Sequence, residues 1–443
     1  MNYRTNIATI HVDNLKIVEP LKIEPIAAKS PEDDSCFCLS ASPILLIAKL
    51  FGLFPITSRH VKGQCTYSKS KIWLIYSIVI FLIYLSHVFM TTDLLRFDKN
   101  KPLPELLSAI NDIMYAIFVA ILTIISILRY PRFVKMLNTL VPLVKDAGLV
   151  CPSALASLRR VQYGYLTLFF AEMSVQYGVL IGVHYSDRYA TNFDYNMFIH
   201  VGVKNIPFVF YLLFFLFCSA FISVLACFEK LIISALKFTP VHPSNNIDET
   251  NNKRDFIGLI KYEVCKQDHK CFGKMMDLTQ AELVEHLRAL HEDISLVIYD
   301  FNACMNPQLL FHSIVELAVL IIHWYEVLIY TSYTFSSPFA SAINFVNWTF
   351  VIAHSVGLFL FLKSAQDLKN MTHGLTNFLL EYSTRITDPE EHQQVRIFIE
   401  KLQQHRPITA SGVFNVDLGI AGPIAANILT YVLVALQFDI PKN

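Results

Sequence analysis

Ionisable and aromatic side chains stand inside the longest apolar stretches of this sequence. Charges at such positions are rare in membrane segments and usually face a cavity. Aromatic walls with a few carboxylates suit an aromatic or amphipathic organic molecule, including a cationic one. The candidate ligand-binding residues are Glu326, His323, Trp324, Tyr325, Tyr330, Trp348, Asn347, Glu172, Gln176, Tyr177 and Asp112. For each of them taken singly, a structural hydrogen bond is the alternative.

A second pattern lies in the last apolar stretch, 413–438. Pro423, Asn427, Thr430, Val434 and Gln437 recur at helical spacing and form one narrow stripe, while most other positions are apolar. Amides are costly against lipid unless they meet a partner or water, so this stripe is expected to face protein or an aqueous path. Hydrogen bonding between helices is the alternative.

The other chemical motifs are weak. Cys265-x3-His269-x-Cys271 matches no common zinc arrangement, and His312 and Glu316, one turn apart, have no third ligand nearby in the sequence. Neither a phosphate-binding glycine loop nor a nucleophile elbow is present. We therefore expect no metal, no cofactor and no enzymatic activity. The nine scattered cysteines are expected to be reduced.

Composition indicates what must position these residues. Hydrophobic residues make up 54% of the 443 residues and charged residues only 16%, which is more apolar mass than a soluble core can hide. A lipid bilayer is therefore the expected surroundings. Lys+Arg and Asp+Glu balance at 36 each, so no basic excess indicates a nucleic-acid partner.

A bilayer core of about 30 Å requires about 20 apolar residues in a helix. Seven stretches meet this requirement, near 71–92, 105–128, 161–185, 197–229, 305–334, 341–365 and 413–438. The sequence thus predicts an all-α, seven-transmembrane helical protein of the plasma membrane. The stretch from Pro43 to Ile56 is apolar but short, so an interfacial or packed helix is expected there.

The basic residues predict the orientation. With a cytosolic N-terminus, 30 Lys and Arg residues fall on the cytosolic side and 6 outside. Leaving out the long 230–304 connection, which is too long to count reliably, still gives 21 against 6. We therefore expect the N-terminus to be cytosolic and the C-terminus extracellular.

The spans and the orientation predict six parts. These are a cytosolic leader with an interfacial helix (1–70), helices 1–4 (71–229), a cytosolic loop with a helical extension (230–304), helices 5–6 (305–365), a cytosolic anchor segment (366–412), and helix 7 with a short extracellular tail (413–443). An apolar stripe running from the N-cap candidate Thr279 predicts that the fifth helix projects past the membrane. A second cytosolic helix is predicted at 388–404. These helical extensions either form a bundle that holds subunits together or lie against their own subunit.

Two other classes of membrane protein fit the sequence less well. Asp187-Arg188-Tyr189 reproduces a tripeptide of many G-protein-coupled receptors, but that class requires the opposite orientation and the last helix lacks an Asn-Pro-x-x-Tyr element. A transporter predicts internal repeats or paired broken helices, and the sequence shows neither.

The terminal residues carry a family resemblance. Thr430-Tyr431, five apolar residues and Gln437-Phe438 end the seventh helix, and together with the length and orientation they resemble insect gustatory receptors across the whole chain. The resemblance implies a ligand-gated, non-selective cation channel, a homotetramer or a heteromer with related receptors, whose last helix lines the pore. It implies that Gln437 lines the pore, that Phe438 or Val434 forms a hydrophobic gate, and that Thr430 and Tyr431 brace the helix. With Asn427 these are the candidate pore residues.

The chain differs from one branch of that family. Many sweet-taste members resemble one another in a glutamate directly after the Thr-Tyr pair, where this chain has Val432. Together with the aromatic candidates, this favours a bitter or deterrent plant compound as the tastant. A fructose-like sugar is the alternative.

Overall fold

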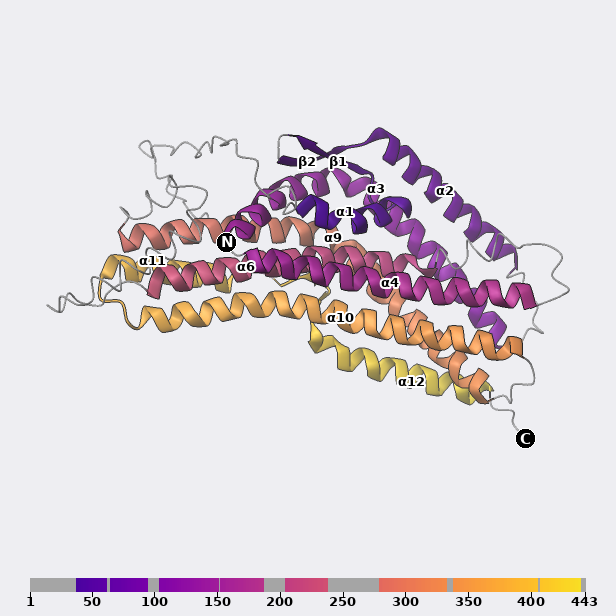
Figure 1. The fold of residues 1–443 in the computed structure, drawn as a ribbon. Helices are drawn as coiled ribbons and strands as arrows, with labels where there is room; N and C mark the ends of the chain where they lie inside the picture. Colours follow the sequence, from indigo (N-terminus) through magenta and orange to yellow (C-terminus); the bar gives the residue numbers. More distant parts are fainter. Residues whose placement is uncertain are drawn as a thin grey trace, which may run out of the picture. The chain divides into compact units, whose positions relative to one another are not determined.

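A computed structural model describes residues 37–61, 64–94, 103–150, 152–186, 204–237, 279–332, 338–404 and 407–439, and Figure 1 shows the fold. The Asp187-Arg188-Tyr189 tripeptide and the Cys265–Cys271 motif lie outside these residues. Residues 35–443 form one unit by their contacts, and every described helix and strand belongs to this unit.

Each of the seven predicted spans corresponds to one long helix. They are α2 (Lys71–Leu94), α3 (Leu103–Val150), α4 (Pro152–Ser186), α6 (Ile206–Lys237), α9 (Gln280–Ser332), α10 (Pro338–Ser383) and α12 (Ala421–Asp439). Among the described residues, five of these helices, α3, α6, α9, α10 and α12, are long and apolar enough to cross a membrane. α2 is a shorter apolar helix over Lys71–Ser86 by the same measure, and α4 carries more polar residues.

The helix predicted to run from Thr279 into the fifth span is a single long helix, α9. α9 has 53 residues, or about 80 Å at 1.5 Å per residue, far more than a bilayer core needs. Thr279 and Glu282 form a capping box at its start: the Glu282 amide donates to Thr279 Oγ1 at 3.3 Å and the Thr279 amide donates to Glu282 Oε2 at 2.8 Å. The long apolar stripe thus begins at a defined residue.

The predicted helix at 388–404 is α11 (Pro389–Gln403). Asp388 caps it by accepting a hydrogen bond from the Glu390 amide at 3.1 Å, and Pro389 fits the first turn because the missing N–H is not needed there. Its buried face, which includes Val395, Phe398 and Leu402, packs against α9 and α10. Burial of this face explains why so short a helix is ordered.

The chain before α2 differs from the prediction. The short interfacial or packed helix expected from Pro43 to Ile56 is α1 (Phe37–Leu50), so Pro43 lies inside it, and its buried side chains pack against the bundle. Gly52, with φ of +75°, ends it: the Gly52 amide donates to Lys49 O and the Leu53 amide to Ala48 O, which is the Schellman arrangement that favours glycine.

A β-hairpin follows α1 and was not predicted. β1 (Ile56–Val61) pairs antiparallel with β2 (Gln64–Lys69), and Asn138 of α3 holds β2 through two hydrogen bonds with the Tyr67 backbone at 2.7 and 2.9 Å. Cys65 in β2 is disulfide-bonded, so the prediction of reduced cysteines is wrong at this residue. Cys218 and Cys304 are free and buried, and Cys227 is buried as well.

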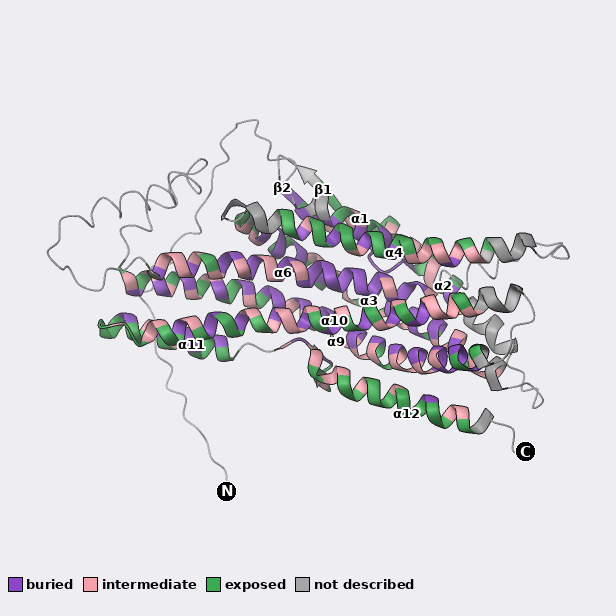
Figure 2. Ribbon diagram, turned by 60° about the horizontal axis from the view of Figure 1, so that its bottom comes forward, coloured by how far each residue is buried: buried purple, intermediate pink, exposed green. Residues whose placement is uncertain are grey.

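α6 forms the centre of the bundle. It packs against α1, α3, α4, α9 and α10, and Figure 2 shows it buried along most of its length. Gly357 of α10 lets the two helices approach, because a β-carbon there would lie 2.8 Å from the ring of Tyr211, which is 1% exposed. A side chain at this position has no room unless a packed ring moves.

We therefore expect Gly357→Ala to lower the stability of the protein by about 1–3 kcal/mol, the usual cost of overpacking a core. The measurement is the melting temperature of the purified protein in detergent. Gly164→Ala in α4 is the matched control, since nothing lies within 4 Å of its β-carbon position and helix propensity favours alanine by about 1 kcal/mol. Equal melting temperatures for the two variants would contradict the packing argument.

Candidate functional site

Three polar side chains from three helices are hydrogen-bonded in the buried interior. His354 of α10 lies between Glu316 of α9 and Tyr115 of α3: its Nδ1 is 2.7 Å from Glu316 Oε1 and its Nε2 is 3.2 Å from the Tyr115 hydroxyl. None of the three is more than 1% exposed. Buried polar groups are tolerated in such surroundings when they are paired, so this contact fixes how the three helices align.

A second polar group extends along the same helices. His323 Nε2 lies 3.3 Å from Asn111 Nδ2, and its Nδ1 lies 3.1 Å from Glu326 Oε2. Because the Asn111 amide nitrogen donates, Nε2 is the acceptor and Nδ1–H donates to the carboxylate. The imidazole also stacks on Phe350, with ring centroids 5.3 Å apart. His323 is therefore held on both edges and on one face.

Polar contacts continue from this group to α4 and to the two residues that precede α6. Lys204 Nζ lies 3.4 Å from Asp112 Oδ1, and the same ammonium lies 5.7 Å from the centroid of the Phe350 ring. Gln176 donates to Glu172 Oε1 at 2.6 Å and accepts from Asn205 Nδ2 at 2.6 Å. Since Asp112 and Lys204 are chain neighbours of Asn111 and Asn205, these contacts lie near one end of the bundle.

The structure brings many of the predicted ligand-binding residues close together. His323, Glu326 and Asp112 belong to the contacts above, as do Glu172 and Gln176. The rings of Trp324 and Trp348 meet edge to face at 6.0 Å. Tyr325 is buried, Tyr177 and Asn347 are half-buried, and the side chain of Tyr330 lies outside the described ones.

Sequence reasoning missed several members of this network, namely Tyr115, Lys204, Phe350 and His354. His354 carried the same signal as His323, an ionisable residue within an apolar stretch, and could have been found by it. Among the described residues, no group of three or more His, Cys, Asp or Glu side chains is placed to hold a metal ion.

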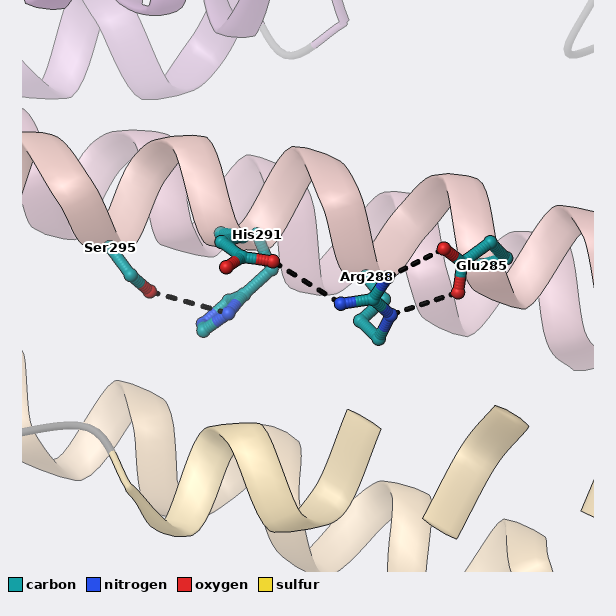
Figure 3. A network of polar contacts seen from close by, with 5 residues as sticks. Glu285, Arg288, His291 and Ser295 are labelled. Carbon is teal, nitrogen blue, oxygen red and sulfur yellow. Dashed lines mark hydrogen bonds and ion pairs between the residues drawn. The ribbon is translucent and has the colours of Figure 1, made fainter. Parts of the chain in front are cut away.

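A separate cavity of about 240 Å³ lies between the start of α9 and the end of α11. Its lining includes Arg288, His291 and Lys401, and none of the predicted ligand-binding residues. Figure 3 shows the local contacts: Arg288 donates to Glu285 at 2.5 and 2.9 Å and to Glu292 at 3.2 Å, and Ser295 lies 3.3 Å from His291. Arg288 is thus committed to carboxylates of its own helix.

α12 contrasts with α3, α6, α9 and α10 because little of it is buried (Figure 2). Ile424, Ile428 and Val432, spaced four residues apart, form its inward stripe, and Val432 is 3% exposed. Asn427, Thr430, Val434 and Gln437 are exposed, with Thr430 Oγ1 bonded to Ala426 O at 2.8 Å. The side chain of Phe438 lies outside the described ones. The predicted polar stripe thus points away from the rest of this chain.

Comparisons with known proteins agree with this architecture. A family profile described as "7tm Chemosensory receptor" matches residues 41–441. No curated protein sequence matches the chain. Two solved structures of the insect olfactory receptor OR5 from Machilis hrabei share the fold at 14% identity, covering 90% of this chain and 97% of that one. The TM-score is 0.59 for the complex with eugenol and 0.57 for the receptor without it.

The buried contact at His354 generates a stability prediction. We expect His354→Ala to cost about 3–5 kcal/mol, because it leaves the Glu316 carboxylate buried without its partner. The melting temperature in detergent measures the effect. Lys363→Ala is the control, since it breaks an exposed ion pair with Asp367 at 2.9 Å that is worth about 0–1 kcal/mol. A loss no larger at His354 than at Lys363 would show that the contact does not hold the helices.

Proposed function

The chain belongs to the 7tm chemosensory receptor family, and on this premise we propose that it is a gustatory receptor acting as a ligand-gated, non-selective cation channel. Its multi-pass helices place it in the plasma membrane. The observation that carries the proposal is the exposure of α12. An apolar helix with exposed amides at Asn427 and Gln437 is incomplete in one chain, because lipid cannot satisfy those amides.

Further copies of the receptor complete this face in the proposal. A homotetramer, or a heteromer with related receptors, places α12 of each subunit around a central axis, where the polar stripe meets water. In this proposal 230–304 is a cytosolic loop with a helical extension, 366–412 is the cytosolic anchor segment, and 413–443 holds the pore helix and a short extracellular tail. The excess of basic residues on one side supports a cytosolic N-terminus and an extracellular C-terminus.

The proposed pore closes by excluding water. A ring of Val434 or Phe438 side chains is apolar, and such a constriction removes water that an ion needs. Gln437, one turn from Val434 along the helix, supplies amide oxygens that partly replace the hydration shell when the ring widens. A ligand that binds at the end of α9 carrying His323 and Glu326 has to favour the open form of the pore. A ligand shifts an equilibrium only by binding one of the two states better.

We propose the polar and aromatic network around His323 as the ligand site. Its rings and carboxylates favour an aromatic or cationic compound, for which a bitter or deterrent plant compound is the first choice. The similar OR5 receptor was solved with eugenol, which supports a small organic ligand in this fold. The amides and carboxylates of Gln176, Asn205 and Glu172 also suit hydroxyl groups, so a fructose-like sugar is the second candidate.

The channel mechanism is tested by expressing the receptor in a non-insect cell and recording currents against a panel of eugenol, plant alkaloids and sugars. We expect Gln437→Ala to change the unitary conductance and the sodium-to-potassium permeability ratio. Gln366→Ala is the control, because this half-buried glutamine lies on α10 and bonds Asn370. Currents that require an added G protein would contradict the channel mechanism, and unchanged conduction in Gln437→Ala would remove this residue from the pore.

The ligand site is tested by dose-response curves. We expect Trp348→Ala and Glu326→Gln to raise the half-maximal concentration of the activating compound by up to about ten-fold, since an aromatic contact is worth about 0.5–1.5 kcal/mol. The amount of either variant at the cell surface should equal that of the unmodified receptor. Trp73→Ala, in a tryptophan of α2 that contacts Tyr76, is the matched control. Curves that coincide with those of the unmodified receptor in both site variants would contradict this assignment.

A further inference from the structure

α9 has a break in its hydrogen-bond ladder at Pro307. A proline within a helix has no N–H, so the carbonyl four residues earlier, that of Ala303, loses its helical donor. Arg129 of α3 supplies the replacement by donating from Nη1 to Ala303 O. Gln308, the residue directly after the proline, donates from its side chain to Ser126 Oγ of α3 at 3.0 Å. The discontinuity in α9 is thus supported from α3.

The residue before this proline holds the segment that leads into α12. Asn306 Oδ1 accepts from the Ser411 amide at 3.0 Å and from Thr409 Oγ1 at 3.2 Å, and Asn306 O accepts from Ser411 Oγ at 3.2 Å. Asn302 Oδ1 accepts from the Thr409 amide at 3.2 Å. These four hydrogen bonds fasten one short hairpin to α9.

The hairpin consists of β3 (Thr409–Ala410) and β4 (Phe414–Asn415). Ser411 at its turn has φ of +52°, a left-handed conformation that side chains rarely adopt, so the bonds from Asn306 hold a strained residue. After β4, Asp417 caps the 3-10 turn η2 (Leu418–Ile420) and pairs with Lys369 of α10 at 3.0 Å. α12 begins directly afterwards. The start of α12 is therefore held by contacts with α9 and α10, whereas the rest of the helix packs against the bundle only through the stripe of Ile424, Ile428 and Val432.

We propose that Asn306 is a positioning residue that couples α9 to the pore helix: its side-chain oxygen holds the β3–β4 hairpin at the Pro307 discontinuity, so that a change in α9 moves the start of α12. The inference rests on the proposed channel function. The half of α9 that follows Pro307 carries His323 and Glu326, which belong to the proposed ligand site. α9 therefore contacts both the ligand site and the segment that leads into the pore helix. A helix discontinuity with side-chain support on both flanks is a suitable place for the two halves of α9 to change their angle.

The test compares Asn306→Ala with Asn306→Asp in purified receptor reconstituted into planar bilayers. The described contacts use the Asn306 side chain only as an acceptor, and aspartate keeps that acceptor. We expect Asn306→Ala to change the open probability without ligand about ten-fold, within the range of coupling between linked sites, while the unitary conductance stays the same. Asn306→Asp should restore the open probability. Asn370→Ala, in an exposed asparagine of α10, is the control.

Hydrogen exchange on the same samples reports on the tether itself. In Asn306→Ala, the amides of 409–421 should exchange faster, and those of α11 should not change. An unaltered open probability in Asn306→Ala, or a failure of Asn306→Asp to restore it, overturns the inference. If the unmodified receptor carries no ionic current at all, the proposed function fails instead, and faster exchange at 409–421 would then report only a structural contact.

Discussion

Lipid tails offer no hydrogen bonds, and the arrangement of the helices follows from that constraint. Polar side chains of α3 and α9 within the bundle are therefore stabilised by partners inside the protein. Four contacts meet this need along the two helices and fix their register: Asn111 with His323, Tyr115 with His354 and Glu316, Ser126 with Gln308, and Arg129 with Ala303. A shift of one helix along the other would break all four together.

The parts of the fold that were predictable are those governed by local rules. Apolar length located the seven helices, and the Thr279 and Asp388 caps together with Pro389 located the starts of α9 and α11. The hairpin β1–β2 was missed because its residues are mostly polar and its stability comes from α3, through Asn138. α1 was misplaced because Pro43, taken as a beginning, lies inside a packed helix.

The network of polar contacts was only partly predictable. Single residues such as His323 and Glu326 stand out as ionisable groups in apolar stretches, and their spacing of three brings them together on one helix. The partnership of Tyr115 with His354 joins positions 239 residues apart, which no local pattern encodes. Likewise the helical wheel identified the polar stripe of α12, but only the folded chain shows that Ile424, Ile428 and Val432 turn the stripe away from the bundle.

The enclosure of α6 has a consequence for how the protein gains its stability. Its phenylalanine-rich surface is as compatible with lipid as with neighbouring helices, so leaving lipid provides little hydrophobic free energy. Association has to come from shape instead, through ring contacts such as Phe214 with Phe361 at 4.4 Å and Phe217 with Phe301 at 5.3 Å. Side-chain volume therefore matters more than polarity for packing in α6, and two residues of equal hydrophobicity are not interchangeable there.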